Sequence, residues 1–230
     1  MTRLPFALLV ASALAVSACS SSSSSPDGLP CVGTPTVSDG TYIYDTLRIG
    51  TQCWMRQNLN SGTMVPSTQA QGPATVQKYC YDDDEDNCHV WGGLYQWPMA
   101  MNGSTTEGAR GICPVGWHIP TLSEWETLAS YVGGAPVAGA ALKSSGTSLW
   151  MNGNVGTDAY NFSLLPAGSH EGTSFLGLTE EAVVWTSHPI TTPPSENNAS
   201  ARYTQYDQNL LVEDDNLRTF AFSVRCLKDR

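Results

Sequence analysis

The chain has 230 residues and carries 11 lysines and arginines against 21 aspartates and glutamates, a formal net charge of −10. Proteins that bind nucleic acid neutralise phosphates with clustered cations, and the absence of such a cluster here argues against nucleic acid as a partner. Hydrophobic residues make up 41% of the chain and seven residues are tryptophan. This supply of apolar side chains predicts a packed core and excludes a globally disordered chain.

Residues 1–18 have the pattern of a secretory signal peptide. Arg3 precedes an almost unbroken apolar run over residues 4–16, which is too short to span a bilayer as a stable helix. The run ends in Val16-Ser17-Ala18-Cys19, which is similar to the bacterial lipobox, whose cysteine is acylated. We therefore expect cleavage before Cys19 and lipidation of Cys19. The alternative is an ordinary signal peptide followed by a chance cysteine.

A serine run over residues 20–25 follows the predicted lipidation site. Such a run is typical of a flexible linker, and we expect a tether over residues 19–37 and one domain over residues 38–230. Because two or more acyl chains hold a protein stably on a membrane, the chain is expected to be lipid-anchored in the cell envelope. Ser20 stands where lipoproteins kept at the inner membrane often carry aspartate, which favours the outer membrane.

The first predicted elements after the tether are strands. Aromatic and β-branched residues predict a hairpin from residues 42–44 and 47–50, leading into residues 52–55. Residues 60–75 are polar and predict a surface loop. A short strand over residues 79–81, an acidic loop and a brief helical piece near residues 99–101 are expected next.

The clearest helix signal begins at Thr121. Thr121 and Glu124 have the spacing of a capping box, in which each side chain binds the backbone N–H of the other residue. Apolar residues then recur on one face, and Gly133-Gly134 ends the pattern. This predicts one principal helix near residues 121–132.

The second half of the chain predicts short strands separated by turn residues, over 161–165, 174–178, 183–186, 201–206 and 220–226. No internal repeat is present. The expected fold class is α+β, with mainly short antiparallel strands and long loops around one principal helix.

Six cysteines remain once Cys19 is assigned to lipid, and in an oxidising compartment an even number predicts disulfides with several possible pairings. The shortest spacing favours one local bridge, the cysteines flanking the first strand pair favour another, and the last two cysteines would join the middle of the chain to its end. The favoured pairs are Cys31–Cys53, Cys80–Cys88 and Cys113–Cys226. The alternative is zinc, against which the lack of Cys-x-x-Cys pairs argues.

Five consecutive carboxylates occupy residues 82–86. Their mutual repulsion favours a bound cation, and Ca²⁺ prefers such oxygen ligands, with Asp82, Asp84 and Asp86 as the candidate set. The alternative is a solvated acidic loop. An EF-hand is excluded because Asn87 stands where that loop needs glycine.

Exposed tryptophans are a second class of candidate, because aromatic faces suit sugar rings. Most tryptophans lie within predicted elements and are expected in the core, whereas Trp150 lies in the polar stretch 144–154 and is expected to be exposed and to bind ligand. The histidines form no metal motif, and His118 is expected to be structural. Residues 168–172 do not match the nucleophile elbow of hydrolases and are expected to form a turn.

Five motifs occur in order along the chain: Ile49-Gly50-Thr51-Gln52-Cys53-Trp54-Met55 with Asn58-Leu59, Cys80-Tyr81-Asp82, Tyr95 with Trp97, Cys113-Pro114-Val115-Gly116-Trp117-His118-Ile119-Pro120-Thr121 with Glu124-Trp125, and Phe222-Ser223-Val224-Arg225-Cys226. Together they resemble the Fibrobacter succinogenes major paralogous domain family. The resemblance runs from residue 38 to the C-terminus and implies an exported protein or lipoprotein, with no defined molecular role.

Residues 118–126 are also similar to a helix start in the formylglycine-generating, sulfatase-modifying superfamily. That similarity implies a C-type-lectin-like fold. The enzymes of the superfamily use a late reactive cysteine pair, whereas only Cys226 lies late in this chain. The oxidative activity is therefore not implied.

The resulting expectation is a membrane-anchored, non-catalytic binding or adhesion module, without catalytic residues, whose partner is a polysaccharide or a surface protein. Fold alone does not decide function. Two alternatives remain, an oxidative enzyme related to the formylglycine-generating group and a purely structural envelope protein.

Overall fold

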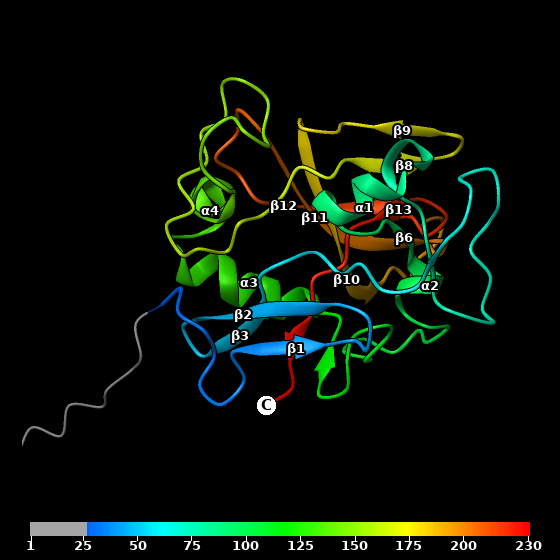
Figure 1. Cartoon of the computed structure of the whole chain (residues 1–230), viewed down its shortest axis with the longest axis horizontal. Coiled ribbons are helices and arrows are strands. Elements are labelled where there is room, and N and C mark those ends of the chain that lie inside the picture. Colours follow the sequence, from blue (N-terminus) through cyan, green and yellow to red (C-terminus); the bar gives the residue numbers. More distant parts are fainter. Residues whose placement is uncertain (1–26) are drawn as a thin grey trace, which may run out of the picture.

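A computed structural model describes residues 27–230. The predicted signal peptide, Cys19 and the serine run lie outside these residues. The described chain folds into a mixed structure in which short, mostly antiparallel strands outnumber the helices (Figure 1). Within residues 27–230, no helix combines the length and apolar character needed to cross a bilayer.

The first sheet joins the two ends of the described chain. The last strand lies between strands from the start and the middle of the chain, so that the C-terminus lies next to the first hairpin (Figure 1). All pairs are antiparallel, in the order β1 (Thr36–Ser38), β2 (Ile43–Ile49), β3 (Gln52–Met55), β14 (Leu227–Lys228) and β7 (Trp117–His118). The hairpin predicted between residues 42–44 and 47–50 was wrong, because residues 43–49 form one continuous strand, β2. This strand instead forms a hairpin with β3, the segment that was expected to follow it.

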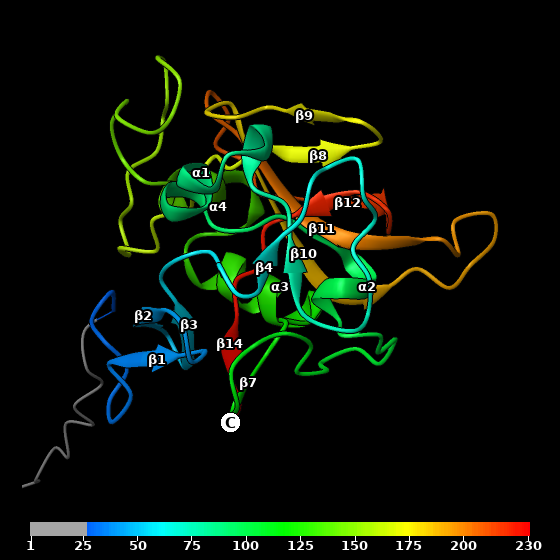
Figure 2. The same ribbon diagram turned by 45° about the vertical axis from the view of Figure 1, so that its right-hand side comes forward.

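Two further antiparallel sheets build the other half of the molecule (Figure 2). One has the order β10 (Glu181–Pro189), β11 (Asn198–Gln205), β12 (Val212–Leu217), and the other β6 (Tyr95–Gln96), β13 (Ala221–Phe222), β8 (Ser169–Glu171), β9 (Ser174–Leu176). Short parallel strands β4 (Thr63–Met64) and β5 (Gln77–Lys78) lie within and just after the predicted loop. Residues 161–165 form no strand and residues 169–171 are strand β8 rather than a turn, so both predictions were wrong.

The predicted capping box is present at the start of helix α3 (Leu122–Tyr131). Thr121 Oγ1 accepts from the Glu124 N–H at 3.1 Å, and Glu124 Oε2 accepts from the Thr121 N–H at 2.9 Å. These bonds satisfy two backbone donors that have no partner within the helix. The prediction of this helix is therefore confirmed.

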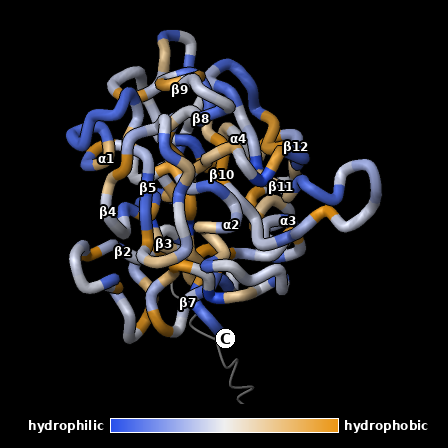
Figure 3. The backbone as a smooth tube through the Cα atoms, turned by 90° about the vertical axis from the view of Figure 1, so that its right-hand side faces the viewer, coloured by the Kyte–Doolittle hydropathy of each residue, from blue (hydrophilic) through white to orange (hydrophobic). Residues whose placement is uncertain are grey.

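The remaining helices are short. Helix α1 (Glu85–Trp91) and a 3₁₀ turn (Tyr81–Asp83) replace the expected acidic loop. In Figure 3 the chain before α1 is hydrophilic and lies at the periphery. Helices α2 (Trp97–Ala100) and α4 (Ala135–Leu142) complete the set, and the sequence analysis did not predict α4.

Aromatic side chains form the centre of the core. In one cluster the Trp54 ring lies 4.8 Å from Trp125 and 5.6 Å from Phe162, between centroids. In another the Trp185 ring lies 4.4 Å from Phe222. Burial of such large apolar side chains contributes about 2–3 kcal/mol each, so these clusters hold the sheets together.

Three disulfides cross-link the fold, and they are the pairs that the sequence favoured: Cys31–Cys53, Cys80–Cys88 and Cys113–Cys226. The third joins residues 113 positions apart. A bridge of this span restricts the unfolded chain strongly, with an entropic contribution of about 4–5 kcal/mol in the simplest model.

The folded unit begins before residue 38, where the predicted tether ends. Gly28 donates a backbone hydrogen bond to Arg48, and Arg48 donates one to Leu29. Asp27 accepts from the Gly50 N–H and the Tyr131 hydroxyl. Residues 27–37 therefore pack onto the domain instead of belonging to a tether, because backbone pairing and a disulfide both hold them.

Candidate functional site

The structure overturns the prediction that Trp150 is an exposed ligand-binding residue. Its side chain is 1% exposed, and its indole N–H donates to Ser144 Oγ at 3.0 Å and to the Leu164 carbonyl at 3.2 Å. The Lys143 ammonium lies 5.2 Å from its ring. Trp150 belongs to a buried core cluster, so its face is not available to a sugar.

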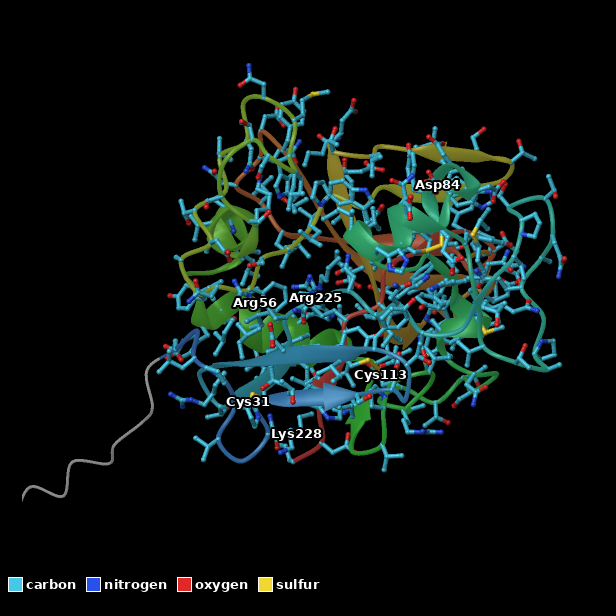
Figure 4. The ribbon with its side chains drawn as sticks, viewed as in Figure 1. Cys31, Arg56, Asp84, Cys113, Arg225 and Lys228 are labelled. Atoms are coloured by element: carbon cyan, nitrogen blue, oxygen red, sulfur yellow. A yellow bond between two sulfur atoms is a disulfide. The ribbon has the colours of Figure 1, made fainter. Side chains whose placement is uncertain are left out.

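The structure also does not gather the candidate calcium ligands Asp82, Asp84 and Asp86 into a metal site. Among residues 27–230, no three His, Cys, Asp or Glu side chains are grouped to hold a metal ion. Asp84 instead caps α1 by accepting from the Asp86 N–H at 3.0 Å, and Figure 4 shows it at the start of that helix. Asp83 accepts from the Ser67 N–H and hydroxyl, both at 2.7 Å.

His118 has the structural role that was expected of it. Its ring nitrogens contact Glu124 Oε2 at 2.9 Å and Asp229 Oδ1 at 2.7 Å, which ties the start of α3 to the end of the chain. Burial opposes the charged imidazole, but the two carboxylates outweigh it and raise the pKa of His118 above 6.5.

A different surface feature has the make-up of a binding site. Between β2 and α1 lies a hollow of about 170 Å³, which we call the aromatic pocket. Both elements are labelled in Figure 1. Its lining includes Tyr42, Ile43, Tyr44, Asn60, His89 and Trp91.

The rings of Tyr42 and His89 stand at one side of this pocket, 6.3 Å apart between centroids and inclined at 64°. Two large apolar side chains lie at the same hollow with much of their surface in solvent, Ile43 at 74% and Val90 at 48%. Exposed apolar groups gathered at a concave surface mark binding sites more often than scattered ones do.

The back wall of the pocket is a buried polar network. The Tyr44 hydroxyl donates to Asp39 Oδ2 at 2.8 Å and accepts from the Asn60 N–H at 3.0 Å. Asn58 donates from Nδ2 to the Trp91 carbonyl at 2.9 Å, which fixes the end of α1 against this wall. Because every one of these groups has a partner, the wall is rigid before any ligand arrives.

Gly92 allows α1 to approach the wall so closely. Its φ of +84° suits glycine, and a Cβ at this position would lie 2.6 Å from Asn58 Cβ. A side chain here would push α1 away from the wall. The aromatic pocket therefore depends on glycine at this position.

A buried cation lies behind the Tyr42 ring. The Lys78 ammonium is 5.4 Å from the ring centroid and donates to Asn60 Oδ1 at 2.6 Å and to the Asn60 carbonyl at 3.1 Å. Burial lowers the pKa of Lys78, although the negative charges of Glu85 and Asp39 oppose that shift. Lys78 is fully buried. It therefore stabilises the wall through Asn60 and is not accessible to a ligand.

The groups left to a ligand are mainly ring faces and edges. Among the described residues, no hydrogen bond engages the ring nitrogens of His89 or the hydroxyl of Tyr42. The arrangement can hold a small, partly apolar ring between aromatic surfaces and offer it polar contacts at the edge. The pocket was not predicted, because it brings together residues 42–44 and 88–92, which are separate in the sequence.

All six cysteines of residues 27–230 are in disulfides, so thiol chemistry at any of them would require that a bridge first be opened. The sequence model of the family described as Fibrobacter succinogenes major domain matches residues 47–228. No curated protein and no solved structure matches the chain.

Proposed function

The chain belongs to the Fibrobacter succinogenes major domain family, and from this premise we propose that it is a non-catalytic module that binds polysaccharide at the cell envelope. The observation that supports the proposal best is the aromatic pocket. It places the Tyr42 and His89 rings beside the exposed Ile43. Sugars present apolar ring faces edged by hydroxyls, and aromatic surfaces with polar groups at their edges complement them.

The rigidity of the wall favours binding further. A preformed site does not lose conformational freedom when a ligand enters, so more of the contact energy appears as affinity. The Tyr44–Asp39 and Tyr44–Asn60 hydrogen bonds hold this wall in place. A hollow of about 170 Å³ suits one ring of a longer chain.

The proposal includes the predicted envelope location. Lipid at Cys19 would hold the folded unit close to the membrane, and the outer membrane is favoured by Ser20. Mass spectrometry of the native protein tests this point, because acylation adds a large and defined mass to the N-terminal peptide. An unmodified residue 19 would remove the anchor from the proposal.

A C-type-lectin-like fold is the finer structural part of the proposal. Its support is the similarity of residues 118–126 to the formylglycine-generating superfamily, together with a confirmed capping box at that helix start. The rival oxidative enzyme is less favoured, because Cys226 is bonded to Cys113. A purely structural envelope protein would need no pocket.

A glycan array tests the function directly. The lipid-free chain from Asp27 onward comprises the whole folded unit described above and would be applied to neutral and acidic plant and bacterial glycans. We expect selective binding to a subset of them, and loss of that binding in Tyr42→Ala. Uniform absence of binding across the array would reject the proposal and favour a structural role.

A further inference from the structure

A second hollow adjoins the aromatic pocket across the Tyr44–Asp39 hydrogen bond. It has a volume of about 500 Å³ and is bounded by the turn after β1 and by the loop that leads to Cys113. We call it the Arg110 pocket, and its polar lining includes Ser38, Asp39, Ser61, Asn102 and Arg110.

The two hollows share one wall. Tyr44 lines the aromatic pocket and Asp39 lines the Arg110 pocket, and their side chains are hydrogen-bonded at 2.8 Å. Asn60 and Ser61, adjacent in the chain, also line one pocket each. The two hollows are therefore separated by the Tyr44–Asp39 wall alone, and a ligand that extends over the turn after β1 contacts both.

The Asp39 and Ser38 side chains of the Arg110 pocket already have partners. The Asp39 carboxylate accepts from the Thr41 N–H at 2.9 Å, the Tyr42 N–H at 2.8 Å and the Tyr44 hydroxyl. The Ser38 hydroxyl donates to the Tyr42 carbonyl at 2.9 Å and accepts from the Gly40 N–H at 3.0 Å. These groups build the wall and have little capacity left for a ligand.

Arg110 is different. Its side chain is exposed, and among residues 27–230 no ion pair or hydrogen bond engages its guanidinium. It is the one cationic side chain among the residues that line the two pockets. The neighbouring Asn102 is also exposed, and its amide has no bond within the described chain. The groups without a partner in the described residues are thus the guanidinium of Arg110 and the amide of Asn102. Both donate hydrogen bonds, so they favour a ligand rich in hydrogen-bond acceptors.

We propose that the Arg110 pocket binds the carboxylate of a uronic acid residue in the polysaccharide whose neighbouring ring occupies the aromatic pocket. This inference rests on the proposed function and narrows its ligand to acidic glycans. A guanidinium matches a carboxylate in a two-point contact that an ammonium cannot make. The negative charge of Asp39 disfavours an acid group beside the turn and directs it toward Arg110.

The charge of the whole chain makes this cation more significant. At a net charge of −10 the protein repels acidic polymers at long range. Such repulsion is screened beyond about 8 Å at physiological salt, so a local contact with Arg110 decides whether an acidic sugar is retained. A neutral sugar gains no charge–charge attraction from Arg110.

The test compares a trigalacturonate with its methyl ester, in which the carboxylates are neutral, by titration calorimetry with the chain from Asp27 onward. We expect the acid to bind more tightly than the ester by about tenfold, the ratio that one charged contact of 1.4 kcal/mol supplies. Arg110→Gln should abolish this preference by weakening the binding of the acid more than that of the ester. Arg110→Lys should restore part of it, and Arg230→Gln, which removes the same charge at the exposed C-terminus, should have no effect.

The outcomes separate the inference from the function on which it rests. Equal affinity for acid and ester, or equal weakening of both in Arg110→Gln, overturns the inference and leaves the glycan-binding function standing. If neither the acid nor the ester binds and no glycan on the array is bound, the inference and the proposed function are both rejected. If the array shows only neutral ligands, the function stands and the acidic ligand is rejected.

Discussion

The buried guanidinium of Arg225 donates two hydrogen bonds to the amide oxygen of Asn58, at 2.9 Å from Nη2 and 3.3 Å from Nε. Figure 4 shows Arg225 in the interior. The carbonyls of Phe162 and Ser163 complete its set of acceptors. Burial lowers the pKa of Arg225 to about 9, although the negative charge of Asp158 opposes the shift. Because Asn58 also lines the aromatic pocket, one residue links the core cation to the site.

Asn58→Ala should therefore destabilise the fold. The change removes two of the bonds to a buried charge and frees the Trp91 carbonyl, with an expected loss of about 3 kcal/mol in the free energy of unfolding. Urea denaturation measures this loss. Asn152→Ala, at an exposed position, is the matched control and should change stability by less than about 0.5 kcal/mol. Equal midpoints for the two variants would show that the Arg225 network is not needed.

Trp150 should matter for stability and not for binding. Trp150→Ala leaves a cavity beside Lys143 and should lower the free energy of unfolding by about 3–5 kcal/mol. Trp150→Phe keeps most of the volume and should fold. Its affinity for any glycan bound by the unaltered chain should be unchanged in calorimetry, and a loss of affinity in the folded variant would restore Trp150 as a ligand-binding residue.

His170 should make the fold sensitive to mild acid. Its ring lies between Tyr79 and Phe175, at 4.8 and 4.9 Å, and both nitrogens are buried without a hydrogen-bond partner in the described chain. Burial lowers the pKa of His170 below 6.5, against the opposing charge of Asp83. The unfolded chain therefore takes up this proton first as the pH falls.

The contribution of His170 to stability is complete above pH 6.5 and is lost as the pH falls from 6.5 to the lower pKa of the folded state. His170→Phe fills similar space without a titrating group. The free energy of unfolding of this variant should therefore fall less steeply with decreasing pH in that window. Urea denaturation at a series of pH values measures the two slopes. Identical slopes would mean that His170 is protonated in the folded protein without cost.

His118 should change the pH dependence of stability in the direction opposite to that of His170. Its folded pKa is raised above 6.5, so its stabilising contribution is present below pH 6.5 and is lost as the pH rises through the folded pKa. Asp229→Asn removes one of the two carboxylates and should lower the pKa of His118, as followed by NMR of the imidazole C–H signals. An unchanged titration in this variant would show that the Asp229 contact does not form in solution.

The parts of the fold that the sequence predicted are those with a local cause. The helix at Thr121 follows from a capping box within four residues, and the pairing of Cys80 with Cys88 follows from their closeness along the chain. Helix α4 was missed because it is short, rich in alanine and glycine, and has no polar face to give a period. Strand β12 was missed because three of its residues are acidic, which suits an exposed edge strand and resembles a loop.

The candidate site was harder to predict because its parts come from distant segments. Trp150 was predicted to be exposed from its polar neighbours in the sequence, but burial depends on tertiary packing, which puts Trp150 in a core cluster with Phe162 and Leu164. The aromatic pocket needs Tyr42 beside His89, a contact that tertiary structure creates. No residue spacing within the sequence predicts the contact between Tyr42 and His89.

The most direct test of the central claim, that the aromatic pocket holds a sugar ring, is the affinity of Tyr42→Ala for the best glycan found on the array. Calorimetry should show a loss of about fivefold or more, because stacking on an aromatic ring contributes about 1–3 kcal/mol. Tyr131→Ala, at a tyrosine 51% exposed and outside the pocket, should bind like the unaltered chain. Undiminished binding by a folded Tyr42→Ala variant would contradict the account.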